Sequence, residues 1–436
     1  MNNAKHLKNV LNYNIEKLAA WKSDFLYEPD KDFTRDGKLS FESIVHFIIG
    51  METGALKDEM FKHFGYSLKT ATTSAMVQAR SKIKYNAFEW LFHTFNDSSF
   101  KAKLFKGYRL IAIDGSTIPI SYDEFDLETY RANHGTEIKG YNAFHMTAAY
   151  DLFEHTYDDV IIQGEGVCNE NSAFNDLVDR YKNKYKAIFI GDRGFESLNS
   201  FVHVMKSGNK FLIRVKDIHS ATSVAKSFGL PEGEFDMDVS RILTRRNTNE
   251  IKAHPEIYKF MPKNQRFDFF EEDNKFFDFK CRVVRFKISE DTYETIFTNL
   301  DREDFPSEII KELYNFRWGV ETSFRELKYA IGLNAFHAKK RNSIKQEIYA
   351  RLILYNFSER VIRKIKIKNL NKKYLYQVNF TRAFHILREF LNKKGRKNLP
   401  NVESLIAKEI LPIRPGRSDP RKVKPKSVVC FTYRFD

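Results

Sequence analysis

The chain has 436 residues, of which 42% are hydrophobic and 15% aromatic, which is enough to build several domains with sizeable cores. The formal net charge of +15 favours a polyanionic partner, with nucleic acid ahead of a membrane surface. No stretch approaches the roughly 20 apolar residues that cross a bilayer, and the first residues lack the apolar run of a signal peptide. The three cysteines, Cys168, Cys281 and Cys430, are odd in number and far apart, which excludes a disulfide framework and a Cys-x-x-Cys zinc site. A reducing cytoplasm is the expected compartment.

The first hundred residues favour helices. Ser40 is a candidate N-cap for a helix over 41–49, and Gly50 suits its end. The apolar side of this helix consists of Phe41, Ile44, Phe47 and Ile48. A second helix is expected over 55–64, ended by Gly65.

A third, small and polar helix is expected over 72–83. It carries Gln78, Arg80 and Lys82. Short helices joined by a turn that contains glycine fit a DNA-reading helix-turn-helix. A plain helical bundle fits the same pattern equally well.

From residue 104 the pattern becomes that of an α/β layer. Strands are expected over 108–113, 141–150, 159–163, 187–190 and 210–215, with a helix over 171–181. Residues 218–290 break this alternation and favour a mostly β insertion, after which 293–300 returns the chain to the core. Beyond Leu333 helices resume with basic clusters at 339–341, 363–368 and 393–397, each of which is more often a solvated face than a DNA contact. The tail over 414–426 is expected to be extended.

A helix over 313–328 carries the most informative pattern. Tyr314, Arg317, Glu321 and Lys328 sit at offsets of 0, 3, 7 and 14, which places them within roughly 60° of one another on an α-helix. A separate apolar stripe would dock the helix on a core. That stripe consists of Leu313, Phe316, Val320, Phe324, Leu327 and Ile331.

Two aspartates precede this helix, each close behind an apolar strand-like run and with a glycine soon after it. They are Asp114 and Asp192. Because the carboxyl ends of strands converge at one edge of an α/β sheet, Asp114, Asp192 and Glu321 would form a set of hard oxygen ligands suited to Mg²⁺ or Mn²⁺. Two such ions can activate a hydroxyl and stabilise the leaving oxygen at phosphorus.

Each residue also has a structural interpretation. An Asp-Gly after a strand is often only a turn, and Arg317 and Lys328 could be surface ion pairs of little energetic weight. Tyr314 could simply be packed, and Gly319 weakens the helix by roughly 1 kcal/mol relative to alanine. The joint occurrence of all these features in one chain favours the catalytic interpretation.

The Tyr-x2-Arg-x3-Glu-x6-Lys pattern of Tyr314, Arg317, Glu321 and Lys328 resembles the signature of DDE transposases of the insertion-sequence-four family. The segments 111–117 and 190–195 are similar to that family's two aspartate segments, and 298–300 to the approach to its signature helix. The resemblance covers roughly residues 104–333.

The resemblance implies an α/β fold with an RNase H-like catalytic core and a β-rich insertion, flanked by helical regions. The expected division is a helical DNA-binding domain over 1–103, the core over 104–217 and 291–345, the β-rich insertion over 218–290, and a helical region with a basic tail over 346–436. Asp114, Asp192 and Glu321 would bind Mg²⁺ or Mn²⁺, and Tyr314, Arg317 and Lys328 would hold phosphates of DNA near the transposon end. Trp318 could stack on a flipped base, although ordinary packing is the commoner fate of such a residue.

The expected activity is that of a transposase, which binds terminal inverted repeats, cleaves there and joins the ends to target DNA. Its partners would be double-stranded DNA and, in the synaptic complex, a second copy of the chain, within a bacterial nucleoid. Two alternatives remain, a non-catalytic DNA-binding regulator derived from a transposase and an RNase H-like nuclease without strand transfer.

Overall fold

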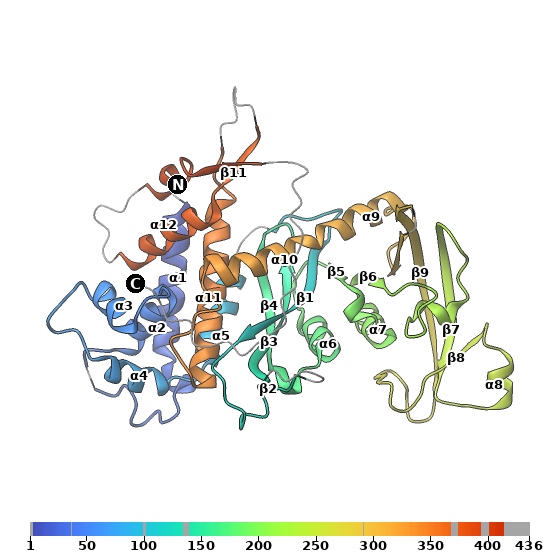
Figure 1. Cartoon of the computed structure of the whole chain (residues 1–436), viewed down its shortest axis with the longest axis horizontal. Helices are drawn as coiled ribbons and strands as arrows, with labels where there is room; N and C mark the ends of the chain where they lie inside the picture. Colours follow the sequence, from blue (N-terminus) through green and yellow to red (C-terminus); the bar gives the residue numbers. More distant parts are fainter. Residues whose placement is uncertain are drawn as a thin grey trace.

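The computed structural model describes residues 3–413 except 36, 99–101, 134–138, 291, 368–373 and 394–400. A large sheet lies at its centre, a bundle of N- and C-terminal helices packs at one end, and a β-rich arm extends from the other (Figure 1). The described part of the chain contains no helix long and apolar enough to cross a membrane.

Five strands form the middle of the sheet. They are β1 (Arg109–Pro119), β3 (Tyr141–Asp151), β4 (Thr156–Gly164), β5 (Ala187–Gly191) and β6 (Lys210–Val215). Their order is β4-β3-β1-β5-β6, in which β3 runs antiparallel to both β4 and β1, while β1, β5 and β6 run parallel to one another. This mixed sheet agrees with the α/β layer that the sequence predicts.

The β-rich insertion continues the same sheet. Strand β10 (Thr292–Thr298) pairs antiparallel with β6 and with β9 (Phe276–Ser289), beyond which come β7 (Phe235–Thr244) and β8 (Tyr258–Phe260). The insertion is therefore hydrogen-bonded to the core through a shared ladder.

Both faces of the central strands are covered, which explains why their sequences are apolar throughout. Leu110 and Ala112 of β1 face the core shared with the helical bundle, whereas Ile111 and Ile113 face a second core. Helices α6 (Glu170–Arg180) and α7 (Leu198–Lys206) cover the second face. The helix expected over 171–181 corresponds to α6, and α7 was not anticipated.

The N-terminal region contains five helices among the described residues. They are α1 (Asn3–Ala20), α2 (Phe41–Gly50), α3 (Leu56–His63), α4 (Thr73–Ser81) and α5 (Asn86–Asp97). The three that were predicted, α2, α3 and α4, begin and end close to the expected positions. The Ser40 side chain accepts a hydrogen bond from the Ser43 amide at 3.2 Å, as expected of an N-cap. Gly65 adopts a left-handed conformation with φ of 70°, the conformation that lets glycine end a helix.

The DNA-reading interpretation of α4 is wrong for one of its three polar residues. Arg80 is only 3% exposed and donates to Glu347 of α11 (Arg341–Ile362) at 2.8 Å. Lys82 pairs with Asp32 at 3.1 Å, and Gln78 is exposed. Arg80 therefore anchors α4 to the bundle and cannot reach a base.

The C-terminal region is built on α11, which runs through the centre of the bundle (Figure 1). It is followed by α12 (Phe380–Asn392) and α13 (Val402–Ile406), with a small ladder of β11 (Tyr376–Val378) and β12 (Ile410–Pro412). Arg341, from the first basic cluster, binds Asp126 and Glu128. The tail over 414–426 and most of the 393–397 cluster lie outside the described residues.

Candidate active site at the edge of the sheet

Two of the expected acidic residues lie side by side at one edge of the sheet. Parallel pairing of β1 with β5 ends at Ile113 opposite Gly191, so the next residues, Asp114 and Asp192, are neighbours. Asp114 lies within β1, because this strand continues to Pro119 in its pairing with β3. The expectation that the strand ends at Asp114 is therefore wrong. The position of Asp114 beside Asp192 is as expected.

Backbone amides fix both carboxylates. The Gly115 amide donates to Asp114 Oδ1 at 2.8 Å, and the Gly194 amide donates to Asp192 Oδ1 at 2.7 Å. Asp192 thereby caps the short 3-10 turn η3 (Arg193–Phe195). Each carboxylate keeps further oxygen lone pairs that these bonds do not use.

The segment that carries Glu321 is not one continuous α-helix. Helix α9 (Ser307–Phe316) ends at Arg317, α10 (Trp318–Arg325) follows, and the next turn, η5 (Glu326–Ala330), is a π-helix. The expected alignment of four side chains on one regular face therefore needs correction, since a π-helical turn is wider than an α-helical one. Lys328 lies in that wider turn and is half-buried.

The apolar stripe on this segment is confirmed except at one position. Phe316 is 38% exposed and packs edge-on against Phe153 at 5.8 Å between ring centroids. The buried members are Leu313, Val320, Phe324, Leu327 and Ile331. Phe316 departs from the stripe because it stands where α9 ends.

Arg317 connects the sheet edge to the helix. Its Nη1 lies 3.7 Å from Asp114 Oδ2, and its Nη2 lies 3.1 Å from Glu321 Oε1. The guanidinium is only 5% exposed and sits over the rings of Tyr314 and Trp318, 5.7 Å and 4.9 Å from their centroids. A buried cation thus stands between two of the three acidic residues.

The pKa of Asp114 records how closely the acidic residues are grouped. Burial is the largest cause that raises the pKa of this carboxyl, to about 6, and the negative charges of Asp192 and Glu321 act in the same direction. The Gly115 amide and the Arg317 guanidinium act in the opposite direction. Like charges raise a carboxyl pKa in this way only when they share a local space.

Hydrogen bonds on the far side of α10 hold this segment in place. Tyr157 Oη lies 2.9 Å from Ser323 Oγ, and Tyr355 Oη donates to Glu326 Oε2 at 3.0 Å. These tyrosines come from β4 and α11 and are fully buried. The orientation of Glu321 toward the sheet edge is therefore supported from both the core and the helical bundle.

The two aromatic residues that contact Arg317 differ in accessibility. Tyr314 is 2% exposed, and burial raises the pKa of its hydroxyl. Trp318 is 57% exposed, so packing has not covered it. The sequence pattern did not distinguish the buried residue from the exposed one.

The donor chemistry of the site suits a hard divalent cation, because it offers carboxylate oxygens without cysteine. Within the described ranges, no group of three or more His, Cys, Asp and Glu side chains is placed closely enough to hold a metal ion. Arg317 lies between Asp114 and Glu321 and pairs with both. An ion bound by both carboxylates requires this guanidinium to move aside.

Sequence reasoning missed a second charged cluster at the same edge. His145 Nε2 lies 2.8 Å from Glu170 Oε1, and His145 Nδ1 lies 3.4 Å from Glu165 Oε2. Although burial opposes it, hydrogen bonds to both glutamates raise the pKa of His145 to about 9. Glu170 gave no signal in the sequence, because an acid in the first turn of a helix is common on helix-dipole grounds alone.

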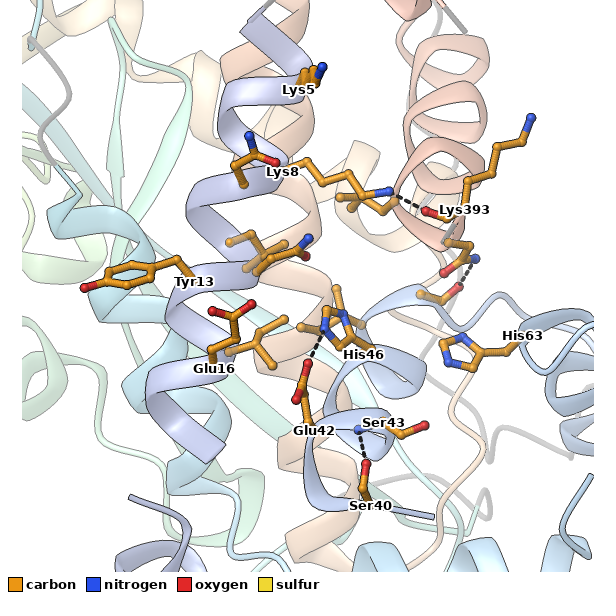
Figure 2. A pocket seen from close by; sticks show the side chains of 18 residues that line it. Lys5, Lys8, Tyr13, Glu16, Ser40, Glu42, Ser43, His46, His63 and Lys393 are labelled. Atoms are coloured by element: carbon orange, nitrogen blue, oxygen red, sulfur yellow. Dashed lines mark hydrogen bonds and ion pairs between the residues drawn. The ribbon is translucent and has the colours of Figure 1, made fainter. Parts of the chain in front are cut away.

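A separate polar pocket of about 690 Å³ lies among α1, α2 and α12 (Figure 2). Lys8 donates there to the carbonyl oxygens of Phe390 and Lys393, at 2.7 Å each, and thereby ties α1 to the end of α12. None of the acidic residues at the sheet edge lines this pocket. The pocket is therefore separate from the acidic residues at the sheet edge.

Comparison with known proteins gives one family and one structural likeness. Residues 105–357, more than half of the chain, match the family described as "Transposase DDE domain". None of the curated proteins compared with the chain matches it. A solved structure of piggyBac transposase, in a synaptic complex with hairpin DNA, is 8% identical, with a TM-score of 0.49 over 96% of this chain and 87% of that one.

Proposed function

Because this chain belongs to the transposase DDE domain family, we propose that it is a DNA transposase of the insertion-sequence type. It binds the terminal inverted repeats of its element, cleaves DNA there and joins the ends to target DNA. The observation that supports this proposal is that Asp114 and Asp192 follow paired residues of neighbouring parallel strands, and that Arg317 contacts both Asp114 and Glu321. The reaction brings two ends together, so the working unit is a pair of chains on double-stranded DNA.

Asp114, Asp192 and Glu321 are assigned as ligands of Mg²⁺ or Mn²⁺. When bound, such ions activate the attacking hydroxyl and stabilise the leaving oxygen at phosphorus. The protein contributes fixed positions, since backbone amides orient the two aspartates and the buried tyrosines support the helix that carries Glu321.

Arg317 and Lys328 are assigned to DNA phosphates. A guanidinium binds carboxylate and phosphate with the same planar fork of donors, so Arg317 exchanges its carboxylate partners for a phosphate as DNA and ions enter. Tyr314, packed beneath it, holds the guanidinium plane in position. Trp318 is exposed next to Arg317 and can stack on a base.

The proposal is tested by incubating the protein with a transposon-end duplex, with and without Mg²⁺, and measuring nicking and joining. Wild-type protein should nick the duplex only with the ion and then join the end to a second DNA. Glu321→Gln should reduce nicking by more than about 100-fold, because even a partner that only orients a metal ligand is worth 10–100-fold. Its affinity for the end should stay within a factor of two.

Glu312→Gln is the matched control, because Glu312 is exposed on α9 of the same segment. It should nick at the wild-type rate. Absence of nicking by the wild type on its own element's ends would leave a DNA-binding regulator as the better description. Nicking without joining would favour a nuclease.

A further inference from the structure

Glu170 lies at the same sheet edge as the two aspartates and has no role in the assignment above. It is the first residue of α6, whose N-cap Asn169 accepts from the Ser172 amide at 2.9 Å. Its side chain is 42% exposed, so one part of the carboxylate faces solvent while the other is held by His145.

Two glycines show how close Glu170 comes to the aspartate segments. A Cβ added to Gly115 would lie 2.6 Å from Glu170 Oε1 and 2.5 Å from His145 Nε2. A Cβ added to Gly194 would lie 3.8 Å from Glu170 Oε2 and 3.0 Å from Asp192 Oδ1. The absence of a side chain at Gly115 and at Gly194 thus leaves room for the Glu170 side chain.

Glu170 and Asp192 lie close to each other beside Gly194. The point where a Gly194 methyl group would stand is 3.8 Å from Glu170 Oε2 and 3.0 Å from Asp192 Oδ1. A water molecule that lies between two carboxylates can donate a hydrogen bond to each of them. Mg²⁺ in proteins keeps several of its waters, so a carboxylate at this distance can act on the ion through its hydration shell.

His145 fixes Glu170 from behind. It is 8% exposed in β3 and lies between Glu170 and Glu165. Glu165 is itself held by Arg131 at 3.1 Å and by the hydroxyl of Tyr141 at 3.3 Å. The contact with His145 holds Glu170 Oε1, while Oε2 lies on the side of Gly194 and Asp192.

We propose that Glu170 is a fourth carboxylate of the reaction centre, a positioning residue that holds a metal-bound water beside Asp192 and is itself oriented by His145. The proposal rests on the proposed function, since it needs a divalent ion at Asp114 and Asp192. It also gives a reason for glycine at positions 115 and 194, where any side chain would displace Glu170 or occupy the space beside Asp192.

The test compares the full-length wild type with Glu170→Gln on a pre-bound transposon-end duplex. The measurements are Mn²⁺ binding by calorimetry, the Mg²⁺ concentration that gives half-maximal nicking, and affinity for the end. Glu170→Gln should weaken Mn²⁺ binding and raise the Mg²⁺ requirement by about 10–100-fold, the usual effect of losing a group that orients a metal site. End affinity should be unchanged.

Three further variants separate positioning from general structure. His145→Gln should show the same defect in milder form, and Glu170→Asp, which keeps the charge, should recover part of the loss if Glu170→Gln folds poorly. Glu308→Gln is the matched control, because Glu308 is an exposed acid in the first turn of α9, and it should behave as wild type.

Asp192→Asn distinguishes failure of this inference from failure of the proposed function. If Asp192→Asn abolishes Mn²⁺ binding and nicking while Glu170→Gln leaves both unchanged, Glu170 has no part in the centre and this inference alone is overturned. If Asp192→Asn also binds Mn²⁺ and nicks as the wild type does, the assignment of the metal site itself is overturned.

Discussion

Replacing Arg80 with alanine should destabilise the protein severely without affecting a DNA contact. The guanidinium donates to Glu347 at 2.8 Å, to Gln346 Oε1 at 3.2 Å and to the Ser343 carbonyl at 2.9 Å. Arg80 and Glu347 are 3% and 1% exposed, so water cannot replace the lost partner. Removing one member of a buried ion pair costs about 3–5 kcal/mol, because the other charge is left buried.

The free energy of unfolding is best followed by tryptophan fluorescence in urea, in a Trp318→Phe background. The two remaining tryptophans, Trp21 and Trp90, contact each other at 5.8 Å within the N-terminal helices and report the region that Arg80 anchors. Affinity for the transposon end should be kept at temperatures where the variant is folded.

Two companion variants make the test specific. Gln78→Ala, on the exposed side of α4, should change stability by less than about 0.5 kcal/mol. The double variant Arg80→Ala/Glu347→Gln should be more stable than Arg80→Ala, because the buried carboxylate that Arg80 neutralises is removed as well. A loss below about 1 kcal/mol for Arg80→Ala, together with weakened end binding, would refute the reasoning and restore Arg80 as a DNA contact.

Three further predictions concern Asp114, Glu359 and Gly115. The pKa of Asp114 is raised to about 6, mainly by burial, so the rate of single-turnover nicking should fall about tenfold per pH unit below pH 6. The pH at which this fall begins should move lower at higher Mg²⁺ concentration. A flat rate profile from pH 5 to 8 would contradict the role of Asp114. Burial raises the pKa of Glu359 to about 8 from 4.5. The folded state therefore keeps a proton that the unfolded state has lost, and stability declines as pH rises from 4.5 to 8. Glu359→Gln should remove this decline, so its free energy of unfolding should exceed that of the wild type by about 3–5 kcal/mol at pH 8. If the urea midpoints of the two proteins change with pH in the same way between pH 4.5 and 8, this prediction is wrong. Gly115→Ala should lower the nicking rate by more than tenfold, because the added methyl group would collide with His145 and Glu170. If the variant nicks at the wild-type rate in the same assay, His145 and Glu170 can move aside without loss of activity.

The sheet edge could be predicted because its signals are local. Buried strands are apolar throughout, so the runs before Asp114 and Asp192 stood out, and the parallel pairing of β1 with β5 then placed these two residues together. The α2 start at Ser40 was predictable for the same reason, since an N-cap bonds within its own turn.

The features that sequence reasoning missed depend on distant partners. The burial of Arg80 is set by Glu347, which lies 267 positions further along the chain. Glu170 is oriented by His145 from another strand, and the break at Arg317 accompanies ion pairs with Asp114 and Glu321. Periodicity within one segment carries no information about such contacts, so it predicted one regular helix.

The internal guanidinium at Arg317 has a consequence for how the protein is made. Acidic groups crowded at one place repel one another, and many binding sites of this kind stay open until their ligand arrives. Here an arginine from the same chain neutralises part of that charge while the fold assembles. We therefore expect the newly synthesised protein to fold without added magnesium, with Arg317 in contact with both Asp114 and Glu321.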